Sequence, residues 1–242
     1  TILFGVTSIL MSRVLPRGKA LRNAFIFSTF VGNYGYLGWG VMYHFYGDTG
    51  FTRSVFFTLF FWPVFLLVGF GLIAFLNREE NVSRKEIARI LLKNSAPPLL
   101  AAGAGLILNL LSVTFPPLIS DFITQFASMT IPLILFTIGL SFHFTLKRSS
   151  LATVLLSCFH RLILGYLLGW AVCCLVSLVF PLDLITRKVI LLESIMPTAA
   201  MAPFFAEHIT VDKKLQASIV TLSTALSLLT IPLWYLITEA LL

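Results

Sequence analysis

Long hydrophobic runs separated by short polar loops extend over the whole chain. Four runs contain no Asp, Glu or Arg, and each is longer than the roughly 20 residues that a helix needs to cross a bilayer: 54–77, 94–120, 122–146 and 215–238. With the weaker runs they predict eight spans, at 1–15, 23–46, 54–77, 94–120, 122–146, 149–180, 189–209 and 215–239. We therefore expect an all-α polytopic membrane protein. Since the first span is short for a bilayer, we also expect the natural protein to extend upstream of Thr1.

Two of the predicted spans are interrupted by residues that break helices. Residues 31–35 read Val-Gly-Asn-Tyr-Gly, and residues 195–199 read Ile-Met-Pro-Thr-Ala, so that Asn33 and Thr198 correspond at an offset of 165 residues. Lipid cannot satisfy the backbone groups that a break exposes, so a break survives only where it lines a cavity or is buried in protein. Paired breaks in two halves of a chain indicate a transporter's binding site.

The order of the spans predicts an inverted repeat. Spans one to three form one repeat and spans six to eight the other, and the two repeats start five spans apart. An odd offset gives the repeats opposite orientations in the membrane. If the halves are symmetric, about two further helices precede Thr1.

Composition and charge agree with a membrane protein and exclude other classes. The chain is 58% hydrophobic and only 11% charged, whereas a soluble domain carries roughly 25% charged residues. Its net charge of +7 would suit nucleic acid, but thirteen basic residues fall in predicted loops on one side of the membrane and three on the other. That asymmetry is the positive-inside pattern and places the 78–93 loop in the cytoplasm. We expect no nucleic-acid partner.

Metal and enzyme sites are not indicated. No His, Cys and carboxylate cluster has the spacing of metal ligands, and no hydrolase or metalloprotease motif is present. Cys158, Cys173 and Cys174 all fall in the sixth span and indicate close packing.

Four motifs in order carry a resemblance to a known family. Residues 132–141 read Pro-Leu-Ile-Leu-Phe-Thr-Ile-Gly-Leu-Ser, 32–38 read Gly-Asn-Tyr-Gly-Tyr-Leu-Gly, 193–197 read Glu-Ser-Ile-Met-Pro, and 222–233 form a Ser- and Thr-rich run that ends at Ile-Pro-Leu. Over nearly the whole chain the sequence resembles the auxin efflux carrier (PIN-like) membrane transport proteins, which are related to bile-acid:sodium symporters. It departs from the family pattern at Gly40, where a Pro is common.

The resemblance implies a ten-span fold of two inverted five-helix repeats, with a scaffold domain, a transport domain and two broken helices that cross. It divides this chain into first-repeat transport helices (1–77), a cytoplasmic linker (78–93), scaffold-type helices (94–146) and second-repeat transport helices (147–242). The family's first two spans are absent here. Scaffold helices imply a homodimer, and the compact loops favour a prokaryotic inner membrane.

The breaks supply the candidate substrate site. Helix N-termini that meet at mid-membrane carry partial positive charge and free N–H donors, which suit a carboxylate. Asn33 either contacts this ligand or only caps a half-helix, and Tyr34 either contacts it or only packs. The candidate substrate-binding residues are Gly32, Asn33, Tyr34, Gly35, Pro197 and Thr198.

Other polar residues within the spans are candidates for coupling. A mid-membrane charge such as Glu193 faces a cavity or a partner, so Glu193 is either a proton carrier, a sodium ligand or a buried residue bonded to neighbouring helices. Arg161 and His160, which could neutralise Glu193 or attract the anion, are secondary candidates, as are Gln125 and Ser128.

We therefore predict a secondary transporter of small organic anions, such as malate, malonate or auxin-like acids, that works by an elevator-type alternating-access mechanism with Na⁺ or H⁺ as the possible coupling ion. The alternative is a PIN-like domain that senses a ligand or lipid without transporting it.

Overall fold

The computed structural model describes residues 1–15, 18–76, 84–140, 150–205 and 210–242, and they are helical almost throughout. This confirms the all-α class. In chain order the elements are α1 (Ile2–Ser12), α2 (Lys19–Phe30), η1 (Tyr34–Gly38), α3 (Trp39–Leu76), α4 (Arg84–Leu110), α5 (Pro117–Leu140), α6 (Leu151–Phe159), η3 (His160–Leu164), α7 (Gly165–Ser177), α8 (Leu184–Ser194), α9 (Ala202–Phe205) and α10 (Lys213–Leu241). The segments η1 and η3 are π-helical.

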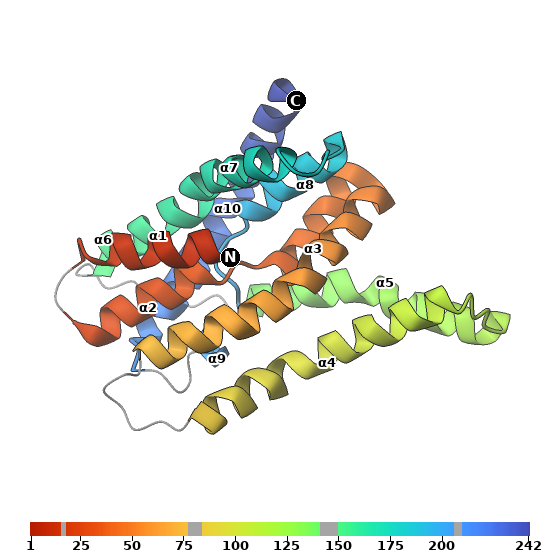
Figure 1. Ribbon diagram of the computed structural model, residues 1–242, viewed down its shortest axis with the longest axis horizontal. Coiled ribbons are helices and arrows are strands. Elements are labelled where there is room, and N and C mark those ends of the chain that lie inside the picture. Colours follow the sequence, from red (N-terminus) through yellow and green to blue (C-terminus); the bar gives the residue numbers. More distant parts are fainter. Residues whose placement is uncertain (16–17, 77–83, 141–149, 206–209) are drawn as a thin grey trace.

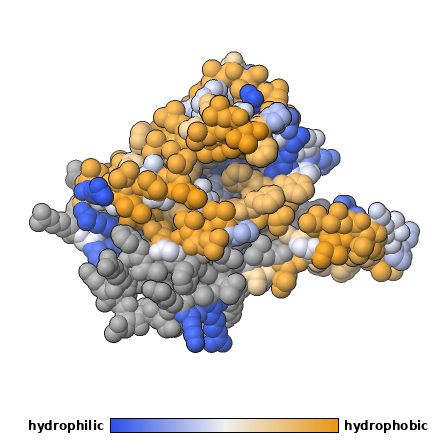
Figure 2. All heavy atoms as spheres, in the orientation of Figure 1, coloured by the Kyte–Doolittle hydropathy of each residue, from blue (hydrophilic) through white to orange (hydrophobic). Residues whose placement is uncertain are grey.

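The surface and the helix lengths fit a bilayer. Among the described residues, three helical stretches are long and apolar enough to span a membrane: Tyr34–Gly69, Leu151–Ser177 and Lys213–Leu241. On the face drawn in Figure 2, the coloured residues are mostly hydrophobic, and the hydrophilic ones lie in a few separate patches. Leu178, Leu228 and Leu229 are each more than 70% exposed. Apolar exposure on this scale marks a surface that contacts lipid or protein.

The two half-helices α2 and α8 form the centre of the molecule. All eight residues from Asn23 to Phe30 are buried, as are five of the last six residues of α8. Helices α1 and α10 pack on α2, and α3 and α7 pack on α8. The sequence explains this position, because α2 and α8 carry small and polar residues among their apolar ones and would be poor lipid-facing helices.

The predicted second and third spans are joined by a kink without a loop. Helix α3 continues through Gly47, which adopts φ 59° and ψ −153°. An L side chain rarely adopts this conformation, so glycine is required here.

Helices α4 and α5 diverge from the turn that joins them (Figure 1), and α4 packs on α3 while α5 contacts η1. Their bounds differ from the predicted spans 94–120 and 122–146. Helix α4 begins at Arg84, within the predicted 78–93 linker, and ends at Leu110. Helix α5 begins at Pro117, since proline fits the first turn of a helix. Residues 78–83 of the linker and 141–146 of the fifth span lie outside the described residues.

Candidate functional site

The two breaks meet and pair through their backbones. Gly32 and Thr198 form an antiparallel bridge. The Asn33 N–H donates to the Pro197 carbonyl at 2.8 Å, and the Ala199 N–H donates to the Val31 carbonyl at 3.0 Å. Segments 165 residues apart therefore satisfy each other's backbone groups, which is what lets two interrupted helices exist away from water. We call residues 31–34 and 195–199 the crossing.

Each break has a local cause. Val31 leaves α2 with extended backbone at φ −104° and ψ 114°. The Asn33 carbonyl then accepts from the N–H groups of Leu37 and Gly38, which starts the π turn of η1. In the second break Pro197 removes a donor, and the next N–H, that of Thr198, donates to the Ser223 hydroxyl on α10 at 3.2 Å.

Two side chains at the crossing are buried without partners. Asn33 is 1% exposed and Thr198 is fully buried. Within the described part of the chain, both polar atoms of the Asn33 amide and the Thr198 hydroxyl have no hydrogen-bond partner, and Asn33 does not cap η1 through its side chain. A buried polar group left unpaired costs about 1–3 kcal/mol. A bound polar ligand would remove this cost.

Arg161 lies beneath the crossing and is fully buried. Its Nε and Nη2 donate to the Met196 carbonyl at 3.0 and 2.6 Å. Its Nη1 donates more weakly, at 3.4 Å, to the Thr29 carbonyl and to the Tyr34 hydroxyl. A Cβ at position 32 would overlap Nη2 and the Tyr34 ring, so the guanidinium packs directly on Gly32.

Glu193 is also fully buried, but its carboxylate points to α3. The Ser54 hydroxyl donates to its Oε1, and its Oε2 has no partner among the described residues. A Cβ at position 38 would overlap this carboxylate, so Glu193 lies against the end of η1. In the described residues it forms no ion pair with Arg161, so of the two roles considered for Arg161, direct pairing with Glu193 is not the one seen here.

The remaining predicted residues lie outside the crossing. His160 is buried, and its Nε2 shares a hydrogen bond with the Thr7 hydroxyl at 2.8 Å. Gly35 faces Thr58 and Trp39 of α3. Gln125 and Ser128 are exposed on α5, where the Ser128 hydroxyl donates to the Gln125 carbonyl at 2.7 Å. The structure brings neither of these two side chains into hydrogen-bond contact with the crossing.

Sequence reasoning missed two hydroxyl groups that contact the breaks. Ser54 opens the predicted third span and bonds Glu193, and Ser223 lies in the polar run 222–233 and bonds Thr198. Ser223 could have been singled out from the sequence, because polar residues repeat along the otherwise apolar span 215–239. The partner of Ser54 could not, because it lies 139 residues away.

Comparisons with known proteins identify the family. The model of the membrane transport protein family matches residues 1–235. The chain belongs to this family. This confirms the resemblance carried by the four motifs, since the family is that of the auxin efflux carriers.

Two archaeal relatives in the transporter family are similar to the chain. An uncharacterized transporter of Methanothermobacter thermautotrophicus is 31% identical over 84% of this chain and 63% of its own length. An uncharacterized transporter of Methanocaldococcus jannaschii is 28% identical over 86% of this chain and 66% of its own length. The chain thus spans just under two thirds of these relatives. The family is one of integral membrane transporters, not of enzymes.

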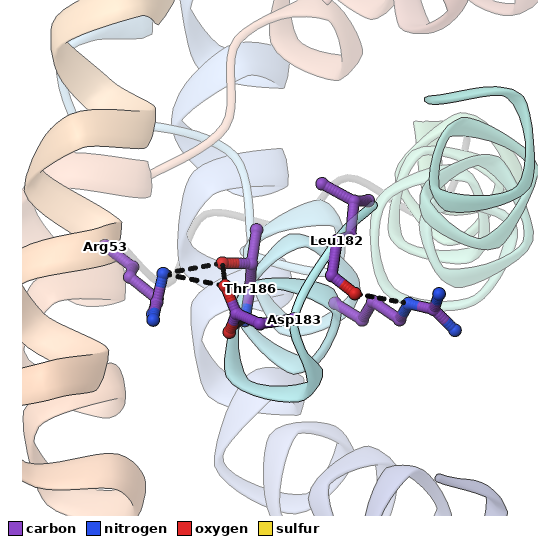
Figure 3. Close-up of polar contacts among 5 residues, drawn as sticks. Arg53, Leu182, Asp183 and Thr186 are labelled. Atoms are coloured by element: carbon purple, nitrogen blue, oxygen red, sulfur yellow. Dashed lines mark hydrogen bonds and ion pairs between the residues drawn. The ribbon is translucent and has the colours of Figure 1, made fainter. Parts of the chain in front are cut away.

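Two ion pairs in this family member link α3 to the start of α8 and α8 to α10. Arg53 of α3 contacts Asp183 at 3.0 Å and donates to the Thr186 hydroxyl at 2.8 Å (Figure 3). Asp183 also caps α8 by accepting from the Thr186 N–H at 3.0 Å. These hydrogen bonds from Thr186, and then the charge of Arg53, hold the pKa of the Asp183 carboxyl below its ordinary value. Lys188 pairs with Glu239 of α10 at 2.6 Å.

A hollow of about 1340 Å³ lies between α1, α3, α7 and α8. Phe56, Phe60 and Phe180 are typical of its lining, which is nearly all apolar. Tyr34 reaches it, but Asn33 and Thr198 do not line it. The polar residues of its lining include Arg53 and Thr186, which already pair with Asp183. A carboxylate bound along the rest of this hollow would lose its hydration against apolar side chains, so we look to the crossing for an anion site.

Proposed function

We propose that this chain carries the substrate site of a secondary transporter for small organic anions, and that the anion binds at the crossing of the two broken helices. The observation that carries the proposal is the pair of buried, unpartnered side chains, Asn33 and Thr198, at the point where the breaks pair. An amide and a hydroxyl can donate three hydrogen bonds to a carboxylate between them.

The helix N-termini next to the crossing also favour a negatively charged ligand. η1 begins immediately after Asn33, and α9 begins a few residues after Thr198. The first N–H groups of a helix have no partner within it and carry partial positive charge. Arg161, packed on Gly32, adds a full positive charge beneath this position. Positive potential from three sources supports an anionic substrate such as malate, malonate or an auxin-like acid.

An inverted repeat with elevator motion accounts for the arrangement. The bridge joins Gly32 to Thr198, one residue from the offset of 165 that relates the two predicted repeats, and in an elevator mechanism the helices that hold both breaks move together past α4 and α5. Glu193, buried next to η1, is the candidate to carry a coupling ion, Na⁺ or H⁺. In the positive-inside orientation the Arg84 end of α4 is cytoplasmic, in a prokaryotic inner membrane.

Uptake into liposomes tests this function. The purified protein should take up radiolabelled malate, malonate or indole-3-acetate, and Asn33→Ala should abolish that uptake. Asn109→Ala is the matched control, because it deletes the same amide from an exposed position on α4.

The outcomes separate the two predicted functions. Saturable binding without uptake or counterflow would favour the ligand-sensing alternative. The proposal fails if none of these anions binds, or if Asn33→Ala and Asn109→Ala transport equally well.

A further inference from the structure

The position of Arg161 points to a built-in cation at the crossing. We infer that the Arg161 guanidinium serves this transporter in the place where a bound metal cation would otherwise hold the carbonyl ends of the two broken helices together, and that the crossing is therefore assembled without Na⁺. The inference rests on the proposed function for its biological meaning, but its geometry stands independently.

Both carbonyls that Arg161 binds belong to helix C-terminal ends. Thr29 is in the last turn of α2, and Met196 lies two residues beyond the end of α8. The last carbonyls of a helix have no partner within it and carry partial negative charge. Two such ends that converge in a buried region attract a cation, and unwound carbonyls of broken helices are positions where transporters coordinate Na⁺.

Arg161 fills this position as a cation with directed donors. Two of its nitrogens converge on the Met196 carbonyl, and the third reaches across to Thr29 at 3.4 Å. It therefore links the first repeat to the second, in addition to the two backbone bonds of the bridge. No carboxylate in the described part of the chain lies within ion-pair distance of it, so its direct contacts are with the carbonyl ends, the Tyr34 hydroxyl and neighbouring rings.

The surroundings of Arg161 fit a charge that stays in place. Its Cζ lies 4.4 Å from the centre of the Phe4 ring and 5.4 Å from that of Tyr34, which are cation–π contacts. It projects from η3, and π turns within α-helices often occur at functional sites. The Leu162 carbonyl in this turn accepts from the Trp234 indole at 2.7 Å, which fixes the segment to α10.

A tethered cation predicts a specific dependence on ions. A carrier with a sodium ion between these carbonyls is stabilised by Na⁺ through mass action. This protein should be indifferent to Na⁺, because Arg161 already occupies the position. Glu193, which has only the Ser54 hydroxyl as a partner among the described residues, is then left to carry a proton.

Thermal unfolding of the purified protein in detergent tests the inference without any substrate. The wild type should have the same Tm, within about 1 °C, in NaCl, KCl and choline chloride at equal concentration. Arg161→Ala should lower the Tm by roughly 5–10 °C, since it removes charged hydrogen bonds from a buried site. Low concentrations of guanidinium chloride should then raise the Tm of Arg161→Ala by about 3 °C, because the ion binds the vacated position.

Arg161→Met is the matched control for this rescue. Its side chain fills the space that Arg161→Ala leaves empty, so guanidinium should not stabilise it, nor should it stabilise the wild type. Urea at the same concentration controls for the solvent effect, as it has the same shape and no charge. Arg161→Lys keeps the charge without the planar fork and should have an intermediate Tm.

Three results would overturn the inference: a wild-type Tm at least 3 °C higher in Na⁺ than in K⁺, an Arg161→Ala protein as stable as the wild type, or a destabilised Arg161→Ala protein that guanidinium fails to stabilise. If Arg161→Ala cannot be purified in a folded state, thermal unfolding of the wild type and of Arg161→Lys tests the inference instead. The inference is supported if Na⁺ does not change the Tm of the wild type and Arg161→Lys has a lower Tm than the wild type. It is refuted if Na⁺ raises the Tm of the wild type. If none of malate, malonate and indole-3-acetate binds, the proposed function is refuted and these results still stand.

Discussion

The two breaks are alike in backbone and different in side chains. Both end a buried half-helix and pair at Gly32 and Thr198. One turn before the first break is Ser28, and at the equivalent position before the second, 165 residues on, is Glu193. Both are fully buried, and each has an oxygen without a partner in the described residues. Only one of them can change its charge.

The way each helix resumes differs too. After Asn33 the chain returns to helix at once, through the π turn of η1. After Pro197 it stays irregular until Ala202. The shared backbone geometry brings the two breaks together. We propose that the unshared side chains give the halves separate roles, with an uncharged amide, Asn33, in the first and a titratable carboxyl, Glu193, in the second. The following predictions test that division.

The largest effect on anion binding is expected from removing the two unpartnered side chains at the crossing, those of Asn33 and Thr198. Asn33→Ala should weaken malate or malonate binding by about 10–100-fold, because hydrogen bonds to a charged group contribute about 1.5–3 kcal/mol. Thr198→Val should weaken binding less, because it removes one hydrogen-bond donor, whereas Asn33→Ala removes two. Isothermal titration of both single variants and the double variant measures the coupling between them.

The exposed Thr52→Val is the matched control for Thr198→Val. Strictly additive losses in the double variant would mean that the two side chains do not hold the same ligand.

The second prediction concerns Glu193, the titratable residue before the second break, and its proposed role in proton coupling. Uptake of malate should rise about tenfold when an inward proton gradient is imposed, and Glu193→Gln should abolish this stimulation, because an amide cannot release a proton. Asp121→Asn, at an exposed position on α5, should keep it. The division of tasks is contradicted if Glu193→Gln remains as sensitive to the gradient as the wild type.

The third prediction tests the close approach at the bridge. Gly32→Ala should lower the Tm by roughly 4–8 °C, because its Cβ would displace the Arg161 guanidinium and the Tyr34 ring, and overpacking costs about 1–3 kcal/mol. Gly71→Ala on α3 is the control, as nothing lies within 4 Å of its added Cβ. Equal Tm values for both variants would show that the crossing tolerates a side chain here.

The smallest effect is expected away from the crossing, at the start of α8. Asp183→Ala should lower the Tm by about 2–4 °C at pH 7, since an N-cap contributes about 1 kcal/mol, whereas Asp183→Asn keeps the cap and should lose less. The pKa of Asp183 is lower in the folded protein, so its charge stabilises the fold above its ordinary pKa. The difference between wild type and Asp183→Asn should therefore shrink as the pH falls below about 4, and a constant difference from pH 7 to pH 3 would contradict the pairing with Arg53.

The sequence predicted an all-α membrane protein and the positions of the two breaks, because apolar length and helix-breaking residues are local properties, but it did not predict the bounds of each helix. The offset of 165 residues also predicted which two segments meet, although the bridge pairs Gly32 with Thr198, one residue away from that offset. The start of α4 was missed because polarity was used to assign 78–93 to a linker, although Arg-Lys-Glu-Ile-Ala-Arg at 84–89 consists mostly of strong helix formers.

The partners of the buried charges could not be predicted. Arg161 binds carbonyls 35 and 132 residues away, and Glu193 binds a hydroxyl on α3. An Arg and a Glu within apolar spans suggest an ion pair, and only the tertiary arrangement shows that helix ends and a serine take the place of the opposite charge.

The central claim is that an anion binds between the two breaks, and an experimental density map of the protein in saturating malonate tests it most directly. The account predicts density for a carboxylate within hydrogen-bond distance of both the Asn33 amide and the Thr198 hydroxyl. Malonate bound elsewhere, with those two side chains still unpartnered, would contradict it.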